Sequence, residues 1–179
     1  ELFSEQLNNW ELARMNYMGL SKVRTKKLAF DGFEILIQFN PARITSSSAK
    51  VDAGSVKQRP CFLCGNNRPK EQKEIPFGDD MIILVNPYPI FRRHLTIPSV
   101  SHTDQRIHDN FRKLLSVSQA MHLYNVFYNG PQSGASAPDH LHFQAGNIGF
   151  LPVEMDFTGR KHASLVSSEP GLDIWKWES

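Results

Sequence analysis

The chain has 179 residues and a formal net charge of +2, with 40% hydrophobic and 21% charged residues. This balance is typical of a globular protein with a hydrophobic core, and the length suits one domain or one domain plus part of another. The net charge gives no indication of a nucleic-acid surface, and no apolar run reaches the roughly 18 residues of a membrane span. Residues 1–4 show no basic segment leading into an apolar one, so we expect no signal peptide and a cytoplasmic protein.

The N-terminal part of the chain predicts a helix followed by a strand. Residues 4–17 have apolar side chains mostly at helical spacing, and Ser4 can cap this helix. Residues 33–39 form an apolar run of strand length, which predicts a buried strand ended by Pro41. Arg43 lies just past the strand end, where binding residues often collect, although an isolated arginine there is more often solvated.

The only 2 cysteines of the chain form a C-x-x-C pair, Cys61 and Cys64, followed by Gly65. Two thiolates at this spacing can chelate one zinc ion, and glycine after the second cysteine permits a tight turn. A redox role is the alternative, but no thioredoxin-like βαβ pattern surrounds the pair. A zinc site would need two more ligands from elsewhere in the chain.

The middle of the chain predicts strands at residues 81–85 and 94–98. A helix should follow, with Ser101 as its N-cap and apolar residues at helical spacing up to Met121. Residues 123–129 are rich in aromatic side chains and predict another strand.

The C-terminal part has a weaker pattern. Residues 156–160 are expected to form a turn, and Trp175 and Trp177 near the end of the chain suggest a surface for a missing partner. We therefore expect the N-terminal portion of a longer protein. The predicted organisation has three parts: an N-terminal helix and basic turn at 1–32, a catalytic domain at 33–150, and a C-terminal extension at 151–179.

A loop of small residues runs directly into a strand that carries alternating histidines. On a strand, His140, His142 and Gln144 would share one face while the residues between them take the other. The preceding loop offers free backbone N–H groups and the hydroxyls of Ser133 and Ser136, a composition suited to phosphate. We interpret this stretch as the active site. A metal-binding pair, or two half-exposed histidines on a sheet face, would give the same short motif.

Several motifs resemble the histidine-triad superfamily, in the branch of galactose-1-phosphate uridylyltransferase, diadenosine tetraphosphate phosphorylase and GDP-hexose phosphorylases. They are H-L-H-F-Q-A at 140–145, the preceding G-A-S-A-P, N-P-Y-P-I-F at 86–91, H-L-T-I-P-S-V-S-H at 94–102 and N-P-A-R at 40–43. The resemblance covers about residues 33–150. It implies an α+β fold with a HIT-like antiparallel sheet and flanking helices, as the N-terminal half of a larger uridylyltransferase-like fold.

The resemblance also implies a nucleotidyltransferase or nucleotide-sugar phosphorylase. Such an enzyme passes a nucleoside monophosphate, through a covalent nucleotidyl-histidine, to phosphate or a sugar 1-phosphate. Its ligands would be a nucleotide or nucleotide sugar and a phosphate-bearing acceptor, with no nucleic acid or membrane partner, and related folds are often homodimers. The alternatives are a dinucleoside polyphosphate phosphorylase or hydrolase, and a non-catalytic zinc-stabilised nucleotide-binding protein.

Roles for individual residues follow from the same resemblance. His142 would be the nucleophile, and Gln144 would hydrogen-bond the phosphoryl oxygens. The residues expected to contact the rest of the substrate are Ser136, Asn129 and, more weakly, Ser133 at phosphate, Asn86 at the ribose or base, and Arg43 at the second phosphate. The ligands expected for a structural zinc ion are Cys61, Cys64, His102 and His140.

The chain departs from the family pattern at two positions. Asp139 lengthens the segment before His140 by one residue, which puts the reach of Ser136 in doubt. Ser46 stands where the uridylyltransferases have a second basic residue, which argues against their mode of sugar-phosphate binding.

Gln144 replaces the third histidine of the hydrolase branch. Because glutamine cannot protonate a leaving group, it favours transfer to phosphate or a sugar phosphate over transfer to water.

Overall fold

The structure, a computed structural model, describes residues 1–31, 33–43, 50–160 and 163–177. The chain forms two compact units, one of Glu1–Val23 with Asn40–Asn147 and the other of Arg24–Phe39 with Ile148–Ser179. Ser46 lies outside the described residues. Among the residues described, no helix is long and apolar enough to cross a membrane.

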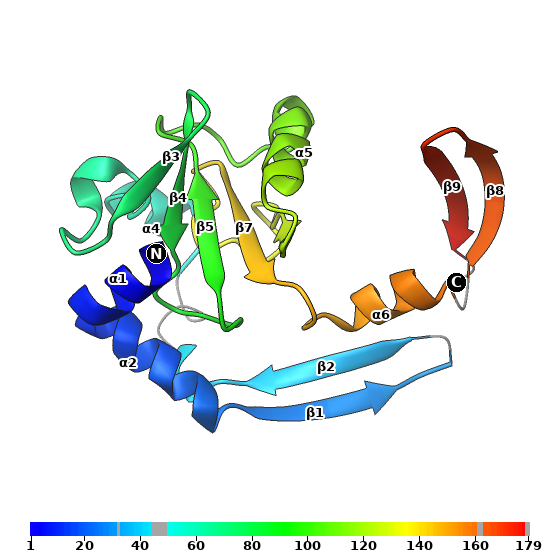
Figure 1. The fold of residues 1–179 in the computed structure, drawn as a ribbon. Helices are drawn as coiled ribbons and strands as arrows, with labels where there is room; N and C mark the ends of the chain where they lie inside the picture. The colour runs from blue at the N-terminus through cyan, green and yellow to red at the C-terminus, as the bar shows by residue number, and fades with distance from the viewer. Residues whose placement is uncertain (32, 44–49, 161–162, 178–179) are drawn as a thin grey trace. The chain divides into compact units, whose positions relative to one another are not determined.

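The larger unit is built on a five-stranded antiparallel sheet in the order β3-β4-β5-β7-β6 (Figure 1). Its strands are β3 Glu74–Phe77, β4 Met81–Val85, β5 His94–Pro98, β6 Tyr124–Phe127 and β7 His142–Asn147. The strands predicted at 81–85 and 94–98 are confirmed to the residue. The α+β, HIT-like fold class that the motifs implied therefore has its sheet in this unit.

Strand β7 begins later than predicted, and this corrects the expectation that His140 lies on it. Leu141 donates its N–H to the carbonyl of Thr103, 2.7 Å away, and accepts from the N–H of Ser99 at 2.9 Å. Because residues 140–141 are held by the 99–103 loop, the strand starts at His142. His140 therefore does not share the strand face of His142 and Gln144.

The helices of the larger unit are α1 Leu2–Asn9, α2 Glu11–Gly19, α4 Ala53–Gln58 and α5 Phe111–Ala120, and its 3-10 turns are η1 Leu20–Lys22, η2 Pro41–Arg43, η3 Gly65–Asn67 and η4 His108–Asn110. The predicted N-terminal helix is broken at Trp10, which is extended (φ −126°, ψ 100°) and buried. Ser101 is not an N-cap, since the long helix begins only at Phe111. The intervening loop is held extended by the Thr103 carbonyl and the Gln105 side chain, both bonded to residues 141–142.

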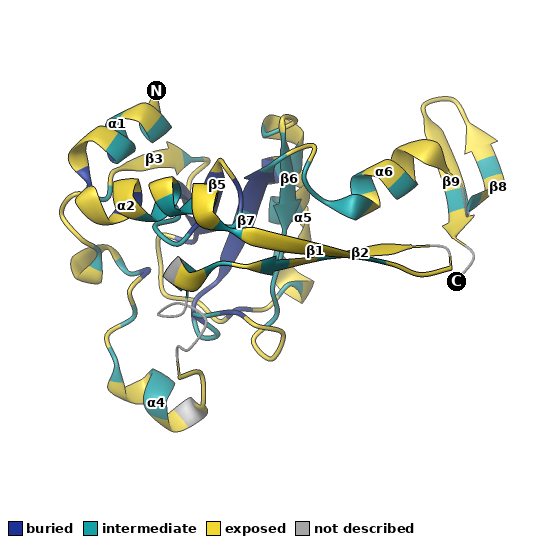
Figure 2. Ribbon diagram, turned by 90° about the horizontal axis from the view of Figure 1, so that it is seen from below, coloured by how far each residue is buried: buried dark blue, intermediate teal, exposed yellow. Residues whose placement is uncertain are grey.

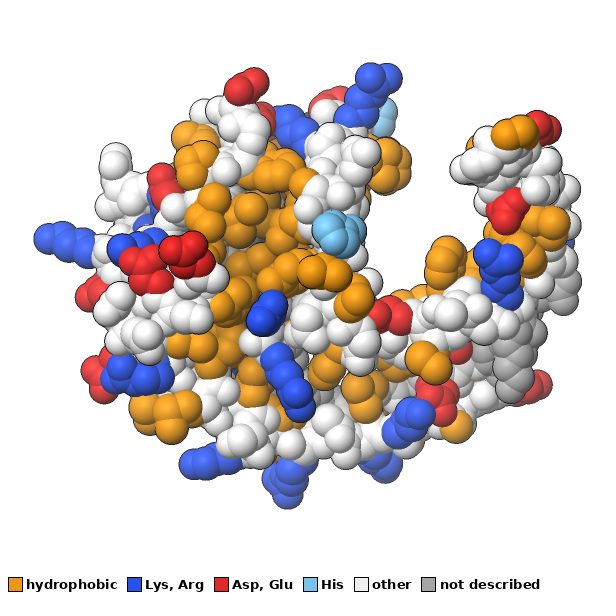
Figure 3. Space-filling model, viewed as in Figure 1, with side chains coloured by type: hydrophobic (Ala, Val, Ile, Leu, Met, Phe, Trp, Pro, Cys, Tyr) orange, Lys and Arg blue, Asp and Glu red, His pale blue; other side chains and the backbone are white. Residues whose placement is uncertain are grey.

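The core lies on one face of the sheet; β5 is buried along its whole length, and β7 is buried along most of it (Figure 2). Its buried members are Met81, Val85, Leu95, Ile97, Val117, Leu141, Phe143 and Ala145. Figure 3 shows hydrophobic side chains over β4, β5 and β7, beside α5. Because side chains alternate along a strand, Phe143 and Ala145 fill this core while His142 and Gln144 point to the opposite face. The opposite face also receives Thr96, which pairs with Gln144 in the antiparallel register.

The smaller unit contains two hairpins and one helix: β1 Arg24–Ala29 with β2 Glu34–Phe39, α6 Pro152–Gly159, and β8 Ala163–Glu169 with β9 Leu172–Trp177. The strand expected at 33–39 is present, but it is not buried, since Ile35 and Ile37 are exposed and, in the part of the chain that the structure describes, β2 pairs with β1 alone.

The turn expected at 156–160 is wrong, because most of it belongs to α6. Glu154 explains the helix. Its carboxylate accepts the N–H groups of Gly149, Phe150 and Leu151 at 2.6, 3.0 and 2.7 Å, and so caps the first turn.

Candidate active site

A cavity of about 540 Å³ lies on the sheet face opposite the core. The predicted site residues that line it are Arg43, Asn86, Asn129, Ser136, His142 and Gln144. Ser133 is exposed and is not among the lining residues, although the adjacent Gly134 is. The strand, the small-residue loop and the segment after β2 therefore meet at one place.

His142 is buried, with 5% of its surface exposed. Its Nδ1 lies 2.8 Å from the carbonyl oxygen of His140. A carbonyl only accepts hydrogen bonds, so Nδ1 must carry the proton and Nε2 keeps its lone pair. Burial lowers the pKa of His142. The ring is therefore neutral near pH 7, in the form that can act as a nucleophile.

Gln105 holds the backbone of His142 in place, and no motif in the sequence singles it out. Its Oε1 accepts from the N–H of His142 at 2.7 Å, and its Nε2 donates to the carbonyls of His142 at 3.1 Å and Asn129 at 2.8 Å. Tyr128 in turn donates its hydroxyl to the Gln105 carbonyl at 2.7 Å. One fully buried amide thus joins the start of β7 to the beginning of the small-residue loop.

His94 fixes the orientation of the Gln144 amide. The N–H of Ile90 donates to His94 Nδ1 at 3.3 Å, so the ring proton is on Nε2, which donates to Gln144 Oε1 at 2.9 Å. Burial lowers the pKa of His94 to about 4, which keeps the ring neutral. With its oxygen occupied, Gln144 keeps its amide N–H groups available to a ligand.

An aromatic shell keeps His94 in position. Phe91 meets its ring edge-on with centroids 5.4 Å apart, and Phe127 lies nearly parallel to it at 6.5 Å. Gly146, which pairs with His94 in the sheet, has no side chain where the Phe91 ring lies. A Cβ atom at Gly146 would fall 2.5 Å from that ring.

Asn86 supports the wall of the cavity through both ends of its amide. Its Oδ1 accepts from the N–H of Tyr88 at 2.9 Å, and its Nδ2 donates to Thr96 Oγ1 at 2.9 Å. These bonds hold the N-P-Y-P turn against β5. Each amide atom keeps one further hydrogen-bonding position for a ligand.

The cavity is positively charged. Arg43 and Arg59 are the charged side chains that line it, and no aspartate or glutamate does so within the described ranges. Burial lowers the pKa of Arg43, which still leaves a guanidinium charged near pH 7. A cavity with this lining favours an anionic ligand.

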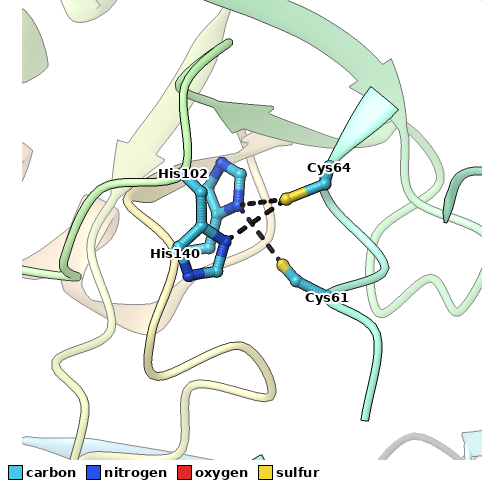
Figure 4. Close-up of side chains that lie close together, drawn as sticks. All are labelled: Cys61, Cys64, His102 and His140. Carbon is cyan, nitrogen blue, oxygen red and sulfur yellow. Dashed lines mark hydrogen bonds between the residues drawn. The ribbon is translucent and has the colours of Figure 1, made fainter. Parts of the chain in front are cut away.

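Beside the cavity, Cys61, Cys64, His102 and His140 converge, with one ligand atom from each within 4.8 Å of the others (Figure 4). Cys61 Sγ lies 3.3 Å from His140 Nδ1, and Cys64 Sγ lies 3.2 Å from His102 Nδ1. All four predicted ligands are thus brought together from three separate segments.

The chemistry of this cluster fits a metal ion. The Nε2 of His140 lies 2.9 Å from the carbonyl of Ser99, to which it must donate, so the lone pair of Nδ1 faces the thiols. When His140 carries a second proton, on Nδ1, its hydrogen bond and charge lower the pKa of Cys61 to about 7 against the opposing effect of burial, so this thiol is the readier of the two to form a thiolate. Two sulfur and two imidazole donors are compatible with zinc.

Asp139, the extra residue before His140, lies next to this cluster. Its Oδ2 is 3.5 Å from His102 Nε2, on the opposite side of the ring from the atom that faces Cys64. Carboxylates commonly orient metal-binding histidines in this way. Asp139, the extra residue relative to the uridylyltransferase motif, therefore pairs with His102 of the Cys₂His₂ cluster.

His140 connects the Cys₂His₂ cluster to His142 on the cavity wall. Its ring belongs to the Cys₂His₂ cluster, while its carbonyl accepts the proton of His142 Nδ1. The position of one residue thus determines both the geometry of the cluster and the tautomer of the neighbouring imidazole.

Comparison with solved structures shows likeness to yeast Ap4A phosphorylase Apa2. Its complex with AMP is 21% identical, with a TM-score of 0.50, over 91% of this chain and 56% of that chain. Its complex with Ap4A is 20% identical, with a TM-score of 0.47, over 90% and 59%. A histidine triad protein from Clostridium difficile is 15% identical, with a TM-score of 0.40, over 51% and 90%.

The chain spans little more than half the length of Apa2. The likeness to the AMP complex confirms the HIT-like fold that the motifs implied. No match was found among curated proteins. Residues 2–147 match the family described as a domain of unknown function, DUF4922. Because this match covers most of the chain, the protein is a member of the DUF4922 family, with the fold of the histidine-triad superfamily.

Proposed function

We propose that this protein is a nucleotidyltransferase or nucleotide-sugar phosphorylase that works through a covalent nucleotidyl-His142 intermediate. The observation that carries this proposal is the buried, neutral imidazole on the cavity wall, whose Nδ1 proton is held by the His140 carbonyl at 2.8 Å. This arrangement leaves the Nε2 lone pair for attack on phosphorus. The amide N–H groups of Gln144 and the positive charge of the cavity support a phosphoryl ligand at the same place.

In the first step, the Nε2 lone pair of His142 attacks the phosphorus of the nucleoside monophosphate unit. A P–N bond forms, the P–O bond to the second phosphoryl group breaks, and its electron pair leaves with the departing phosphate. In the second step, an oxygen of phosphate or of a sugar 1-phosphate attacks the same phosphorus. The P–N bond then breaks and its electron pair returns to Nε2, so the enzyme is regenerated without a change of redox state.

Gln144 would stabilise charge on the non-bridging oxygens in both steps. Its donors are already oriented by His94, so little reorganisation is needed as charge develops. Since neither glutamine nor the neutral His94 is a ready proton donor, the site favours a phosphate acceptor over water. His94, with a pKa of about 4, stays neutral at neutral pH.

We also propose that the Cys₂His₂ cluster holds structural zinc. Four protein donors complete a tetrahedral site with no position left for substrate. The ion would tie the cysteine pair to the 99–103 loop and to the segment that precedes His142. Asn86, Asn129 and Ser136, which line the cavity, are proposed to contact the nucleotide.

The test is covalent labelling with nucleotide sugars that carry a radioactive α-phosphate, using the guanosine, uridine and adenosine compounds separately. We expect label that is stable in base and lost in acid, as a phosphoramidate is, and absent from His142→Ala. His122→Ala is the matched control, because His122 is exposed and should label normally. If the unaltered protein takes up no label from any of these compounds, the covalent mechanism is wrong.

A dinucleoside polyphosphate phosphorylase is the second candidate, favoured by the likeness in fold to the Ap4A phosphorylase structure that contains AMP. Product formation from Ap4A with and without phosphate separates it from a hydrolase, because phosphorolysis stops when phosphate is removed. A non-catalytic nucleotide-binding protein would instead bind nucleotide normally after His142→Asn and give no turnover with any acceptor.

A further inference from the structure

The cavity wall at the end of β4 is mostly apolar and lies away from His142. In the sheet order, two strand spacings of about 5 Å each separate β4 from β7, the strand of His142. The residues that line the cavity from the turn after β4 and from the two segments packed beside it are Trp10, Leu12, Pro69, Gln72, Pro87 and Tyr88. Gln72 brings the one carboxamide of this group.

Hydrogen bonds bring Gln72 and Trp10 to this end of the cavity. Gln72 Nε2 donates to the carbonyl of Val85, the last residue of β4, at 3.1 Å. The carboxamide of Gln6 bonds the backbone immediately before and after Gln72, at 2.8 and 3.1 Å. Trp10 follows Gln6 by one helical turn, and its N–H donates to the Gln6 carbonyl at 2.9 Å. Trp10 therefore lies beside the segment that carries Gln72.

The Gln72 amide is oriented and still able to bind a ligand. A carbonyl only accepts hydrogen bonds, so the contact with Val85 fixes which branch of the amide is Nε2. Nε2 keeps a second N–H, and Oε1 has no partner among the residues that the structure describes. Gln72 is half-buried and lines the cavity, and Oε1 is not an enclosed atom. The amide thus offers one acceptor beside one donor.

A flat heteroaromatic base suits these surroundings better than a hexose does. Apolar and aromatic side chains cover the faces of a base, and an amide pairs with its edge. A hexose presents hydroxyl groups in several directions, and most of them would stay unpaired against this wall. The separation of β4 from β7 also resembles the distance between the phosphorus of a nucleotide and the outer edge of its base. A base at Gln72 therefore allows the phosphorus to lie at His142.

We propose that Gln72 hydrogen-bonds the edge of the nucleobase, while the base packs against Trp10. Gln72 Oε1 accepts from an N–H of the base, and its Nε2 donates to the oxygen or nitrogen beside that N–H. Gln72 is thereby a residue that contributes to base selection. This inference rests on the proposed binding of a nucleotide in the cavity, but not on the covalent step at His142.

The test measures the dissociation constants of GMP, UMP and AMP by titration calorimetry, for the unaltered protein and for Gln72→Glu. Glutamate has the size of glutamine but offers two acceptors and no donor. Guanine presents two adjacent N–H donors to them, whereas uracil and adenine place an acceptor against one carboxylate oxygen. The Kd of UMP and that of AMP, each divided by the Kd of GMP, should therefore rise about 10-fold.

The matched control is Gln58→Glu, which adds the same charge at an exposed position that does not line the cavity. It should leave both ratios unchanged. Partial unfolding of Gln72→Glu cannot produce the expected shift, because a ratio of dissociation constants within one variant does not depend on the folded fraction. A second measurement needs no variant: methylation of guanine at N1, or of uracil at N3, removes the proton donated to Oε1 and should weaken binding to the unaltered protein about 10-fold.

Two outcomes overturn the inference alone: unchanged ratios in Gln72→Glu, which would show that Gln72 only anchors its segment to β4, or methylated nucleotides that bind as tightly as their parents. If the ratios shift as expected but His142 takes up no label, the covalent mechanism fails and the assignment of Gln72 stands. If none of the three nucleotides binds the unaltered protein, both proposals fail together.

Discussion

The replacement Gln105→Leu tests whether the Gln105 amide holds the reactive segment. Leucine has a similar size but makes none of the three hydrogen bonds to His142 N, His142 O and Asn129 O, at 2.7, 3.1 and 2.8 Å. The buried His142 N–H would lose its partner, at a cost of about 1–3 kcal/mol, and each lost bond to a carbonyl adds roughly 0.5–1.5 kcal/mol. We expect the free energy of unfolding to fall by about 3 kcal/mol.

Urea unfolding followed by fluorescence measures this loss, and the rate of His142 labelling measures its effect on the site. Gln119→Leu, an exposed change on α5, is the control and should alter stability by less than about 0.5 kcal/mol. A Gln105→Leu protein as stable as this control would show that His142 is positioned by other contacts. If stability fell but the labelling rate did not, Gln105 would support the fold without positioning the imidazole.

Three further predictions concern pH, metal and packing. Burial lowers the pKa of His94 from 6.5 in the unfolded chain to about 4 in the folded protein. As the pH falls, the unfolded chain therefore takes up this proton before the folded protein does, and the free energy of unfolding should fall by about 3 kcal/mol between pH 6.5 and 4. In acid unfolding curves, His94→Gln should flatten that decline. Removing metal with a chelator should lower both the melting temperature and the rate of His142 labelling, and added zinc should restore both. Purified protein that contains no zinc and is not stabilised by added zinc would contradict the zinc assignment. Gly146→Ala should lower the free energy of unfolding by about 1–3 kcal/mol, because its Cβ would lie 2.5 Å from the Phe91 ring. Gly159→Ala is the control, because a Cβ there would meet open space. Equal stability of the two variants would contradict this packing argument.

Local patterns were enough to predict four strands of the central sheet and the residues that converge on it, but β3 Glu74–Phe77 was not predicted. Residues 81–85 and 94–98 are short apolar runs bounded by turn residues, and their strands match the prediction. The four metal-ligand candidates and the cavity residues lie far apart in sequence. They could be named because the motif resemblance implied their roles, whereas spacing alone left the second pair of metal ligands open.

The missed features depend on contacts between distant segments. The apolar spacing after Ser101 predicts a helix that includes Gln105, but the Gln105 amide is bonded to residues 129 and 142, and no local pattern records such partners. The alternating pattern predicts a strand at His94, whereas the role of His94 depends on the rings of Phe91 and Phe127 and on Gln144 across the sheet. The expected burial of residues 33–39 was wrong for the same reason, since apolar composition predicts a strand but does not say what covers it.

His140 contributes its imidazole to the Cys₂His₂ cluster and its peptide oxygen to His142. Substituting that imidazole would therefore disturb two centres at once, and a relative without the cysteine pair would need another way to hold the proton on the adjacent ring. Across the DUF4922 family, the cysteines and the His-x-His pair should accordingly be gained or lost together. A sequence survey that finds either one regularly without the other would show that the two centres evolve independently.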